Sequence, residues 1–274
     1  MERSVARIET AGPPRRSAAT HVNRFVVAPE NFAAHSPFLM LAEDWFAPPA
    51  GFPTHPHRGM ETVTLVLEGS MEHRDHTGAH GVIGEGDVQW MTAGRGVMHS
   101  EMPGPDGVHS LQLWLNLPAD RKMSTARYAD QPLDSVHRET GEGYELRCYA
   151  GRRGTAELPH GSHYPMGMAA IRLDLGAEVS LNIPSDERGF LYVLEGALDI
   201  GADRTPVSAG QIAWIDPASA GANSLRLTAT APAWAVLYHG RPIEEPVVAH
   251  GPFVMNTTDE IRQAFEDYQR GEFV

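Results

Sequence analysis

The chain has 274 residues, of which 42% are hydrophobic and 21% are charged, proportions typical of a globular protein with a sizeable core. Its formal net charge of −13 at pH 7 argues against direct binding to nucleic acid and gives an anionic membrane no reason to bind it. The single cysteine, Cys148, excludes an intrachain disulfide and suits a reducing compartment.

The first twenty residues, MERSVARIETAGPPRRSAAT, are polar and contain no apolar core of a signal peptide. Further along, no stretch approaches the roughly 20 consecutive apolar residues that a membrane-spanning helix needs. We therefore expect a cytoplasmic protein without a membrane partner.

Short strand-like runs recur along the whole chain, and stretches with helical periodicity are scarce. The runs are rich in Val, Leu, Thr and Tyr, and glycines, prolines and aspartates separate them. Runs of this kind and spacing are typical of an all-β sandwich or barrel. The runs that we expect to form strands are METVTLVLEG (60–69), HSLQLWLNLP (109–118), YELRCYAG (144–151), MAAIRLDLG (168–176) and GFLYVLEGALDIG (189–201).

The segment FPTHPHRGMETV (52–63) holds a first pair of candidate ligands, His55 and His57, on either side of Pro56. Because residues two apart project to the same face of an extended segment, both imidazoles are expected on one face. Pro56 cannot donate to a sheet ladder, which suits the start or rim of a strand. Glu61 follows four residues after His57, so strict alternation would direct its carboxylate inward as well.

Further histidines lie in segments that we expect to be loops. His73, His76 and His80 cluster near an expected hairpin tip, where a solvated loop accounts for them and an accessory metal site is the alternative. His160 and His163 are expected in another polar loop.

The segment GRGVMHSEM (94–102) holds a second pair, His99 and Glu101, again two residues apart. Two such pairs on separate strands can converge inside a small barrel. Three neutral imidazoles and one carboxylate would then surround a divalent first-row metal and leave positions open for substrate or oxygen. Alternation alone does not choose between Glu61 and Glu101 as the carboxylate ligand.

An internal repeat divides the chain. LVLEGSMEHRD (65–75) is similar to YVLEGALDIGA (192–202), and each is followed by a strand that begins with glycine, GDVQWM from Gly86 and GQIAWI from Gly210. Two copies of one β-unit therefore lie about 125 residues apart, and the chain is predicted to be a duplicated β-barrel.

The second copy lacks every candidate ligand. Counted from the glycines that the two copies share, the five corresponding positions hold Asn182, Pro184, Arg188, Asn223 and Leu225. We therefore expect the second barrel to keep the scaffold and to bind no metal.

The boundary between the copies is expected in the polar, weakly periodic segment ADQPLDSVHRETGEG (129–143). We predict an N-terminal metal-binding barrel over residues 1–134, a degenerate, metal-free barrel over residues 135–240, and a tail over residues 241–274.

The tail contains the clearest helix signal in the sequence, TTDEIRQAFEDYQRG (257–271). Thr258 is a candidate N-cap, Ile261, Phe265 and Tyr268 form an apolar stripe, and Gly271 is expected to end the helix.

Several of these segments together resemble the signature stretches of the pirins, a branch of the cupin superfamily. They are HPHRGMETVTLVLEG (55–69), GDVQWMTAGRGVMHSEMP (86–103), LQLWLNLP (111–118), GPFVMNT (251–257) and DYQRGEF (267–273). The resemblance implies an all-β bicupin, in which two cupin (double-stranded β-helix or jelly-roll) barrels pack together and a short C-terminal helix follows. Met60, where an aromatic residue is common, and the additional histidines of DHTGAHG (75–81) depart from the pattern.

The resemblance also implies a ligand set and a metal. In pirins both histidines of the first motif and the His and Glu of the second hold one metal in the N-terminal barrel. Residue by residue these correspond to His55, His57, His99 and Glu101, which would leave Glu61 as a hydrogen-bond acceptor behind the ligands. Fe(II) is the metal implied, and Mn, Co, Ni, Cu or Zn are alternatives.

Several pirins act as quercetin 2,3-dioxygenases, oxidoreductases that open the flavonol heterocycle with O₂ and release carbon monoxide. The resemblance therefore implies a metal-dependent dioxygenase acting on a flavonol-like aromatic substrate. A divalent ion among three neutral imidazoles and one carboxylate keeps a net positive charge, which favours a deprotonated flavonol hydroxyl. Glu101, if it dissociates or rotates, is the natural base for that proton. The residues expected to supply apolar walls are Val63, Leu65, Trp90, Met91 and Leu113.

Two alternatives stay open. Other pirins are described as metal-dependent protein partners, including transcriptional co-regulators, so the chain could be a regulatory or protein-binding module without physiological turnover. For an acidic protein such a partner is expected to be another protein rather than DNA. The second alternative, another cupin reaction on a small enol or sugar, is supported by analogy of fold alone.

Overall fold

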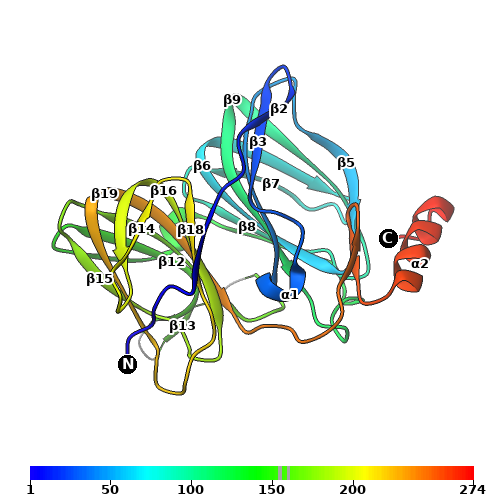
Figure 1. The fold of residues 1–274 in the computed structure, drawn as a ribbon. Helices are drawn as coiled ribbons and strands as arrows, with labels where there is room; N and C mark the ends of the chain where they lie inside the picture. Colours follow the sequence, from blue (N-terminus) through cyan, green and yellow to red (C-terminus); the bar gives the residue numbers. More distant parts are fainter. Residues whose placement is uncertain (154–155, 159–160) are drawn as a thin grey trace. The chain divides into compact units, whose positions relative to one another are not determined.

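The computed structural model describes residues 1–153, 156–158 and 161–274, so His160 lies outside the described residues. The chain divides into two compact units, each built around one β-sheet (Figure 1). Unit 1 comprises Met1–Ala11, Val136–His160 and Pro165–Pro242, and unit 2 comprises Gly12–Ser135, Gly161–Tyr164 and Ile243–Val274. In the part of the chain that is described, no helix is both long and apolar enough to cross a membrane.

The described residues of unit 2 form a nine-stranded sheet. Its main order is β10-β8-β6-β9-β4-β3-β2, with β5 paired to β9 and β7 paired to β6. The strands are β2 (Arg15–Ala18), β3 (His21–Val27), β4 (Phe38–Phe46), β5 (Phe52–His57), β6 (Met60–Asp75), β7 (His80–Gly84), β8 (Val88–Thr92), β9 (Val97–Asn116) and β10 (Arg127–Gln131). A single-turn helix, α1 (Phe32–His35), precedes β4.

The described residues of unit 1 form a ten-stranded sheet. Its main order is β1-β18-β16-β19-β14-β12-β11, with β13 paired to β12, β15 to β19 and β17 to β16. The strands are β1 (Arg7–Thr10), β11 (His137–Gly141), β12 (Tyr144–Arg153), β13 (Ala156–Leu158), β14 (Met166–Leu173), β15 (Glu178–Asn182), β16 (Arg188–Ile200), β17 (Thr205–Ser208), β18 (Gln211–Ile215) and β19 (Ser224–Gly240).

The two sheets share one strand order, as the internal repeat predicts. In unit 2 the sequence β8-β6-β9-β4-β3 corresponds to β18-β16-β19-β14-β12 in unit 1. The glycines that mark the repeat take the same backbone conformation, with φ of +76° at Gly69 and +75° at Gly196. Only glycine adopts such a conformation readily. The all-β prediction and the duplication are therefore confirmed.

The join between the repeats contains regular structure. The segment 129–143, which is polar and weakly periodic in sequence, holds the end of β10, the 3₁₀ turn Leu133–Ser135 and all of β11. β10 pairs with β8 in unit 2, and β11 pairs with β12 in unit 1. The domain limits 1–134, 135–240 and 241–274 stay a prediction. In the structure the N-terminal strand β1 pairs with β18 in unit 1.

The tail after unit 1 packs within unit 2. It forms a hairpin of β20 (Val248–His250) and β21 (Phe253–Met255), followed by α2 (Thr258–Arg270). Thr257 rather than Thr258 is the N-cap of α2, because its side chain and Glu260 form a reciprocal capping box. Gly271 ends the helix as expected, with φ of +70°. Ile261 and Ala264 of α2 are buried against a cluster that includes Phe253, Met255, Phe273 and Met98.

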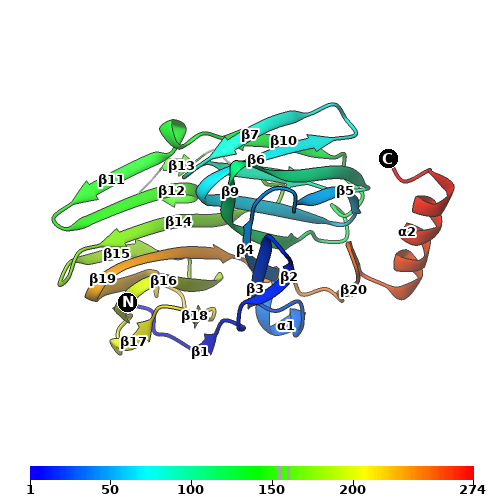
Figure 2. The same cartoon turned by 90° about the horizontal axis from the view of Figure 1, so that it is seen from above.

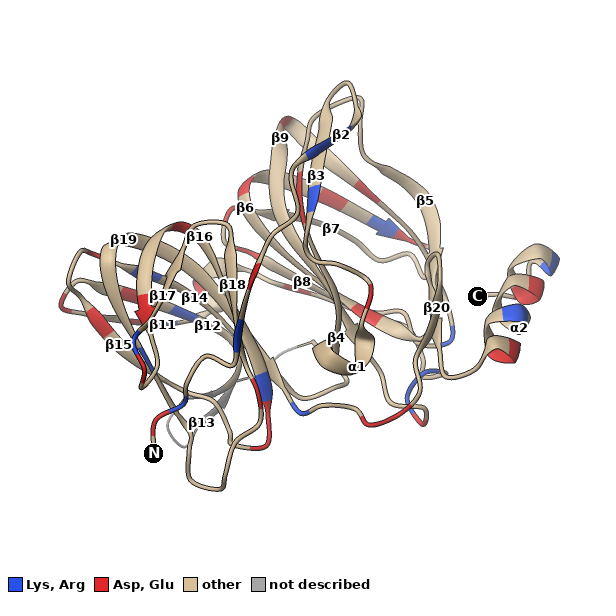
Figure 3. Ribbon diagram, viewed as in Figure 1, with Lys and Arg blue, Asp and Glu red and all other residues tan. Residues whose placement is uncertain are grey.

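Charged residues of both signs are scattered along the strands, the loops and α2 (Figure 3). Viewed from above, β5 runs alongside β9 in unit 2, and this pair of strands carries the candidate ligands (Figure 2).

Candidate metal centre

Three histidines from two neighbouring strands come together in unit 2. β5 pairs with β9 so that His55 lies directly opposite His99, and His57 follows on the same face of β5. One ring nitrogen of each histidine lies within 4.8 Å of the other two. His57 and His99 are 3% and 1% exposed, whereas His55 is only half-buried. Solvent therefore reaches the group at His55.

Burial favours the neutral form of these imidazoles. It lowers the pKa of His57 to about 3, and it also lowers the pKa values of His55 and His99. For His57 and His99 the neighbouring histidines act in the same direction. A neutral imidazole offers a nitrogen lone pair, which is the form that binds a metal.

The ring nitrogens that remain free fit a metal. Among the described residues, His57 Nδ1 and His99 Nε2 are buried without a hydrogen-bond partner. His55 Nδ1 lies 2.9 Å from the carbonyl oxygen of Pro53, which leaves its Nε2 for another contact. Buried polar atoms without partners are rare in native proteins. The two unpartnered nitrogens and His55 Nε2 are therefore suited to a divalent first-row ion, for which imidazole is a common ligand.

Glu101 lies beside this group. It follows two residues after His99 on β9 and is 1% exposed. Gln112 Nε2 donates to its two carboxylate oxygens over 2.9 and 3.0 Å. Burial raises the pKa of Glu101 to about 7, and Asp44 acts in the same direction. The carboxyl group can therefore take up or release a proton near neutral pH.

Glu61 faces away from the histidines, contrary to the expectation from strict alternation. The turn at Gly59, whose φ is +80°, separates β5 from β6 and resets the alternation. The carboxylate accepts hydrogen bonds from Thr92 Oγ1 over 2.6 Å, from the backbone N–H of His163 over 2.7 Å, and from Ser162 Oγ. Glu61 thus anchors a loop within unit 2 rather than standing behind the candidate ligands.

The face of the sheet that carries the histidines is more polar than expected. Gln112 donates to Thr64 Oγ1 over 3.2 Å as well as to Glu101, so Thr64 shares this face. Met91, one of the expected apolar walls, pairs with Thr62 and also lies here. The other four expected walls point to the opposite face of the sheet and are Val63, Leu65, Trp90 and Leu113. Polar residues on the histidine face are Thr62, Thr64, Gln89, Ser110 and Gln112.

Two aromatic rings supply apolar contacts near the histidines. The ring centroid of Trp114 lies 5.2 Å from that of His57, nearly perpendicular to it. The ring of Phe52 lies 6.1 Å from that of His55. Neither ring was anticipated from sequence, although the alternation of β9 places Trp114 on the face of Gln112.

His73 is buried in the site, so the expectation of a solvated loop is wrong for this residue. It is 0% exposed, and its Nδ1 lies 3.4 Å from Nδ1 of His99. Its ring stacks on Tyr128, with the centroids 4.3 Å apart. The other two histidines of the hairpin, His76 and His80, are exposed as expected.

In unit 1 the position that corresponds to the candidate ligand Glu101 is apolar. Leu225 occupies it and lies in the apolar core of that unit.

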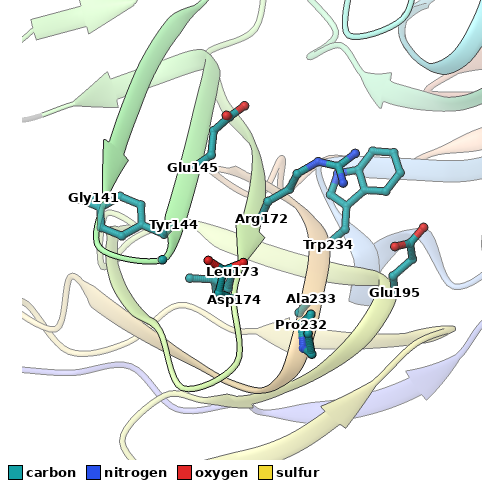
Figure 4. A pocket seen from close by; sticks show the side chains of 11 residues that line it. Gly141, Tyr144, Glu145, Arg172, Leu173, Asp174, Glu195, Pro232, Ala233 and Trp234 are labelled. Atoms are coloured by element: carbon teal, nitrogen blue, oxygen red, sulfur yellow. The ribbon is translucent and has the colours of Figure 1, made fainter.

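Unit 1 also has a pocket of about 380 Å³ on its surface (Figure 4). There the guanidinium of Arg172 lies 4.1 Å from the ring centroid of Trp234, with Asp174 and Glu195 also in the lining. The residues that line this pocket include exposed charged side chains but no histidine, so the pocket differs from the histidine group of unit 2.

Comparison with known proteins identifies relatives along the whole chain. The family model described as Pirin matches residues 7–115, and the model described as Pirin C-terminal cupin domain matches residues 168–274. A protein of Pseudomonas aeruginosa that is provisionally named a quercetin 2,3-dioxygenase is 39% identical over an alignment of 288 positions, which covers 98% of this chain and 97% of that protein.

Two solved structures extend the comparison. The structure of a quercetin 2,3-dioxygenase from Acinetobacter baumannii superposes with a TM-score of 0.90 at 29% identity, covering 99% of this chain and 98% of that one. The bacterial pirin YhhW from Escherichia coli, solved in complex with nickel(II), has a TM-score of 0.67 at 22% identity over 86% of this chain and 100% of that one. At that identity the second comparison supports the fold alone.

Proposed function

Because this chain belongs to the pirin family, we propose that it is a metal-dependent dioxygenase of the quercetin 2,3-dioxygenase type. The observation that carries the proposal is the group of His55, His57 and His99, in which His57 Nδ1 and His99 Nε2 are buried without a hydrogen-bond partner in the described chain. The names of the relatives from P. aeruginosa and A. baumannii support the reaction class.

In this proposal the three imidazoles and Glu101 hold one divalent metal in unit 2. Glu101 shares a strand face with His99, and Gln112 restrains both of its oxygens. Fe(II) is the proposed metal, and the three imidazoles support a divalent first-row ion more generally. When bound, the ion would supply positive charge that favours the deprotonated form of an acidic hydroxyl on the substrate.

The protein's own groups then handle the substrate and its proton. Glu101 is the carboxylate placed to accept the proton of a flavonol hydroxyl if it dissociates or rotates from the ligand set, and Gln112 keeps it oriented. Trp114 and Phe52 offer aromatic surfaces for a planar ring. The polar residues on the same face suit a substrate with several hydroxyl groups, such as a flavonol.

The test is anaerobic loading of the full-length protein with Fe(II), followed by addition of oxygen and quercetin. We expect loss of flavonol absorbance with release of one equivalent of carbon monoxide. His99→Ala should abolish both because it removes a proposed ligand. His80→Ala, which changes an exposed histidine of the same sheet, should leave both unchanged.

The opposite outcome would favour the alternative of a metal-dependent protein-binding module. If one equivalent of metal binds through His99 but quercetin stays intact with each of Fe, Mn, Co, Ni and Cu, the quercetinase proposal fails. The partner would then be sought with the metal-loaded protein and compared with the metal-free form.

A further inference from the structure

Two polar side chains of β6, His73 and Asp75, lead away from His99 in the histidine group. Asp75 lies directly opposite His99 across the β6–β9 pair, and His73 lies opposite Glu101. His73 Nδ1 is 3.4 Å from His99 Nδ1, and His73 Nε2 is 3.5 Å from Asp75 Oδ2. The side chains of His73 and Asp75 are 0% and 2% exposed. The contact between the two imidazoles is therefore shielded from water.

Only one of the two histidines can donate across the contact between their Nδ1 atoms, because the N–H of one ring needs a free lone pair on the other, and a neutral imidazole has one N–H and one lone-pair nitrogen. If His73 donated, its Nε2 would present a lone pair to the carboxylate of Asp75, which is repulsive. His99 would then carry its proton on Nε2, where a metal could not bind. If His99 donates instead, His73 Nε2–H faces Asp75 and His99 Nε2 is left with a free lone pair.

The second arrangement agrees with the remaining contacts. His99 Nε2 and His73 Nε2 are both buried without a hydrogen-bond partner among the described residues, and the Asp75 carboxylate, 3.5 Å from His73 Nε2, favours a proton on that nitrogen by its negative charge. Asp75 is itself held in place, because its Oδ1 accepts hydrogen bonds from the backbone N–H groups of Thr77 and Ala79 over 2.8 and 3.1 Å. Tyr128 stacks on the His73 ring and limits its rotation. The hairpin turn therefore fixes the carboxylate, and the carboxylate faces one nitrogen of His73.

We propose that His73 is a positioning residue for His99: it accepts the Nδ1–H of His99 and so directs His99 Nε2 toward the metal, while Asp75 holds His73 in the tautomer that can accept. This inference rests on the role of His99 as a ligand in the proposed function. Ligand histidines commonly donate their second N–H to a carboxylate, a carbonyl or water, and loss of such a partner typically lowers metal affinity by about 10- to 100-fold. Here an imidazole would stand between the ligand and the carboxylate.

The experiment uses the full-length protein and Ni²⁺ alone as the probe, with affinity measured by competition against a chelator. His73→Phe keeps a stacking ring and removes the acceptor, so we expect Ni²⁺ affinity to fall by about 10- to 100-fold. His73→Asn can place an amide oxygen near the position of Nδ1 and should recover most of that loss. Asp75→Asn keeps the Oδ1 acceptor of the turn and should lower Ni²⁺ affinity, as His73→Phe does. His80→Phe is the matched control on the same hairpin and should leave Ni²⁺ affinity at the wild-type value.

A second readout does not depend on any variant. The ¹⁵N shifts of the ring nitrogens in the metal-free wild-type protein should show His99 protonated on Nδ1 and His73 on Nε2. A wild-type His99 protonated on Nε2 would overturn the inference, even if His73→Phe fails to fold.

Other outcomes separate this inference from the proposed function. If a folded His73→Phe binds Ni²⁺ as tightly as the wild type, or if His73→Asn is no better than His73→Phe, the positioning role is wrong while the ligand set stands. If His73→Phe removes binding as completely as His99→Ala does, His73 is itself a ligand. If His99→Ala leaves Ni²⁺ affinity unchanged, the ligand set of the proposed function fails first.

Discussion

Burial holds the pKa of Glu101 at about 7, and the negative charge of Asp44 acts in the same direction, whereas two hydrogen bonds from Gln112 oppose the shift. In the unfolded chain this carboxyl group would titrate near its ordinary value of 4.5. At pH values between about 4.5 and about 7, Glu101 keeps its proton in the folded protein and loses it in the unfolded chain. The contribution of Glu101 to stability therefore decreases as pH rises from about 4.5 to about 7.

Glu101→Gln should remove this pH dependence in the metal-free protein. We expect the free energy of unfolding of the variant, relative to the wild type, to rise with pH and to gain on the order of 3 kcal/mol by pH 8. Urea unfolding between about pH 5 and 8 measures the difference. Parallel pH profiles for the two proteins would show that the carboxyl group is already ionised at low pH in the folded state.

Lys122 is a buried cation that the sequence did not single out. Its side chain is 1% exposed, and Nζ donates to Asn116 Oδ1 over 2.8 Å, to the Gly59 carbonyl over 2.9 Å and to the Val254 carbonyl over 3.0 Å. Burial lowers its pKa to about 8. The amine thus joins the turn before β6 to the hairpin of the tail.

Lys122→Met keeps most of the side-chain volume and leaves these acceptors without their donor. We expect a loss of roughly 3 kcal/mol in the free energy of unfolding, because each buried unsatisfied acceptor costs about 1–3 kcal/mol. Arg121→Met, which changes a neighbouring side chain that is 54% exposed, is the control. Equal stabilities of the two variants in urea would mean that water replaces the amine.

The hairpin from β6 to β7 shows how a strand and its turns depend on particular glycines. Gly69 has φ of +76°, and a Cβ atom there would lie 2.1 Å from the carbonyl oxygen of Gly107 on β9. Gly78 has a similar φ of +88° at the tip of the hairpin, where a Cβ atom would meet nothing within 4 Å. The two positions therefore separate the backbone cost of an added methyl group from its steric cost.

Gly78→Ala should cost about 1–2 kcal/mol of stability, the penalty for the left-handed conformation alone. Gly69→Ala should cost roughly 1–3 kcal/mol more, because the backbone of β9 must also move. Thermal or urea unfolding of both variants checks the order. If the two substitutions lower the free energy of unfolding equally, the backbone of β9 moves at Gly107 without a measurable loss of stability.

Bulges and turns in the strands also explain why alternation failed for some residues. The register between β6 and β9 shifts between Val66 and Glu68 and again between Gly69 and Met71. Thr64 and His73 are an odd number of residues apart, yet both contact the side chains around His99 and Glu101, because alternation does not carry across these irregularities. The turn at Gly59 has the same effect on Glu61. A period of two extends only as far as the strand is regular, and sequence alone does not mark where a bulge falls.

In the molecule as a whole, each sheet receives an edge strand from a different part of the sequence. β10 follows β9 in the chain and borders the sheet of unit 2, whereas β1 comes from the N-terminus and borders the sheet of unit 1. Arg3, just before β1, is 2% exposed and donates to carbonyl oxygens of unit 1, among them Pro184 over 2.9 Å and Glu187 over 3.0 Å. The first residues of the chain are therefore part of unit 1.

Arg3→Met should destabilise unit 1 by roughly 3 kcal/mol or more, since several buried carbonyls lose a charged donor. Below the unfolding transition, Ni²⁺ affinity should stay at the wild-type value, because every proposed ligand lies in unit 2. Urea unfolding and Ni²⁺ titration of the same preparation test both parts. A matching drop in affinity would contradict the assignment of the site to unit 2 alone.

Much of the fold was accessible from sequence because it depends on local patterns. Short alternating runs between glycines and prolines predict strands, and the recurrence of Gly69 as Gly196 predicts the duplication. The helix of the tail was predicted within one residue at its N-terminus, since capping and an amphipathic stripe are local properties.

Within the candidate site, sequence by itself determined which residues could meet. His55 and His57 share one strand face, His99 and Glu101 share another, and that spacing predicts a convergence inside a barrel. It determined this because side-chain direction within one regular strand follows from its period of two.

Tertiary structure decided what surrounds those residues. It placed His73 against His99, directed Glu61 to Ser162 and His163, and put β1 in the sheet of unit 1. These contacts join residues far apart in the chain or lie beyond a bulge or a turn. No local period carries across such breaks, so only the folded arrangement of the strands determines them.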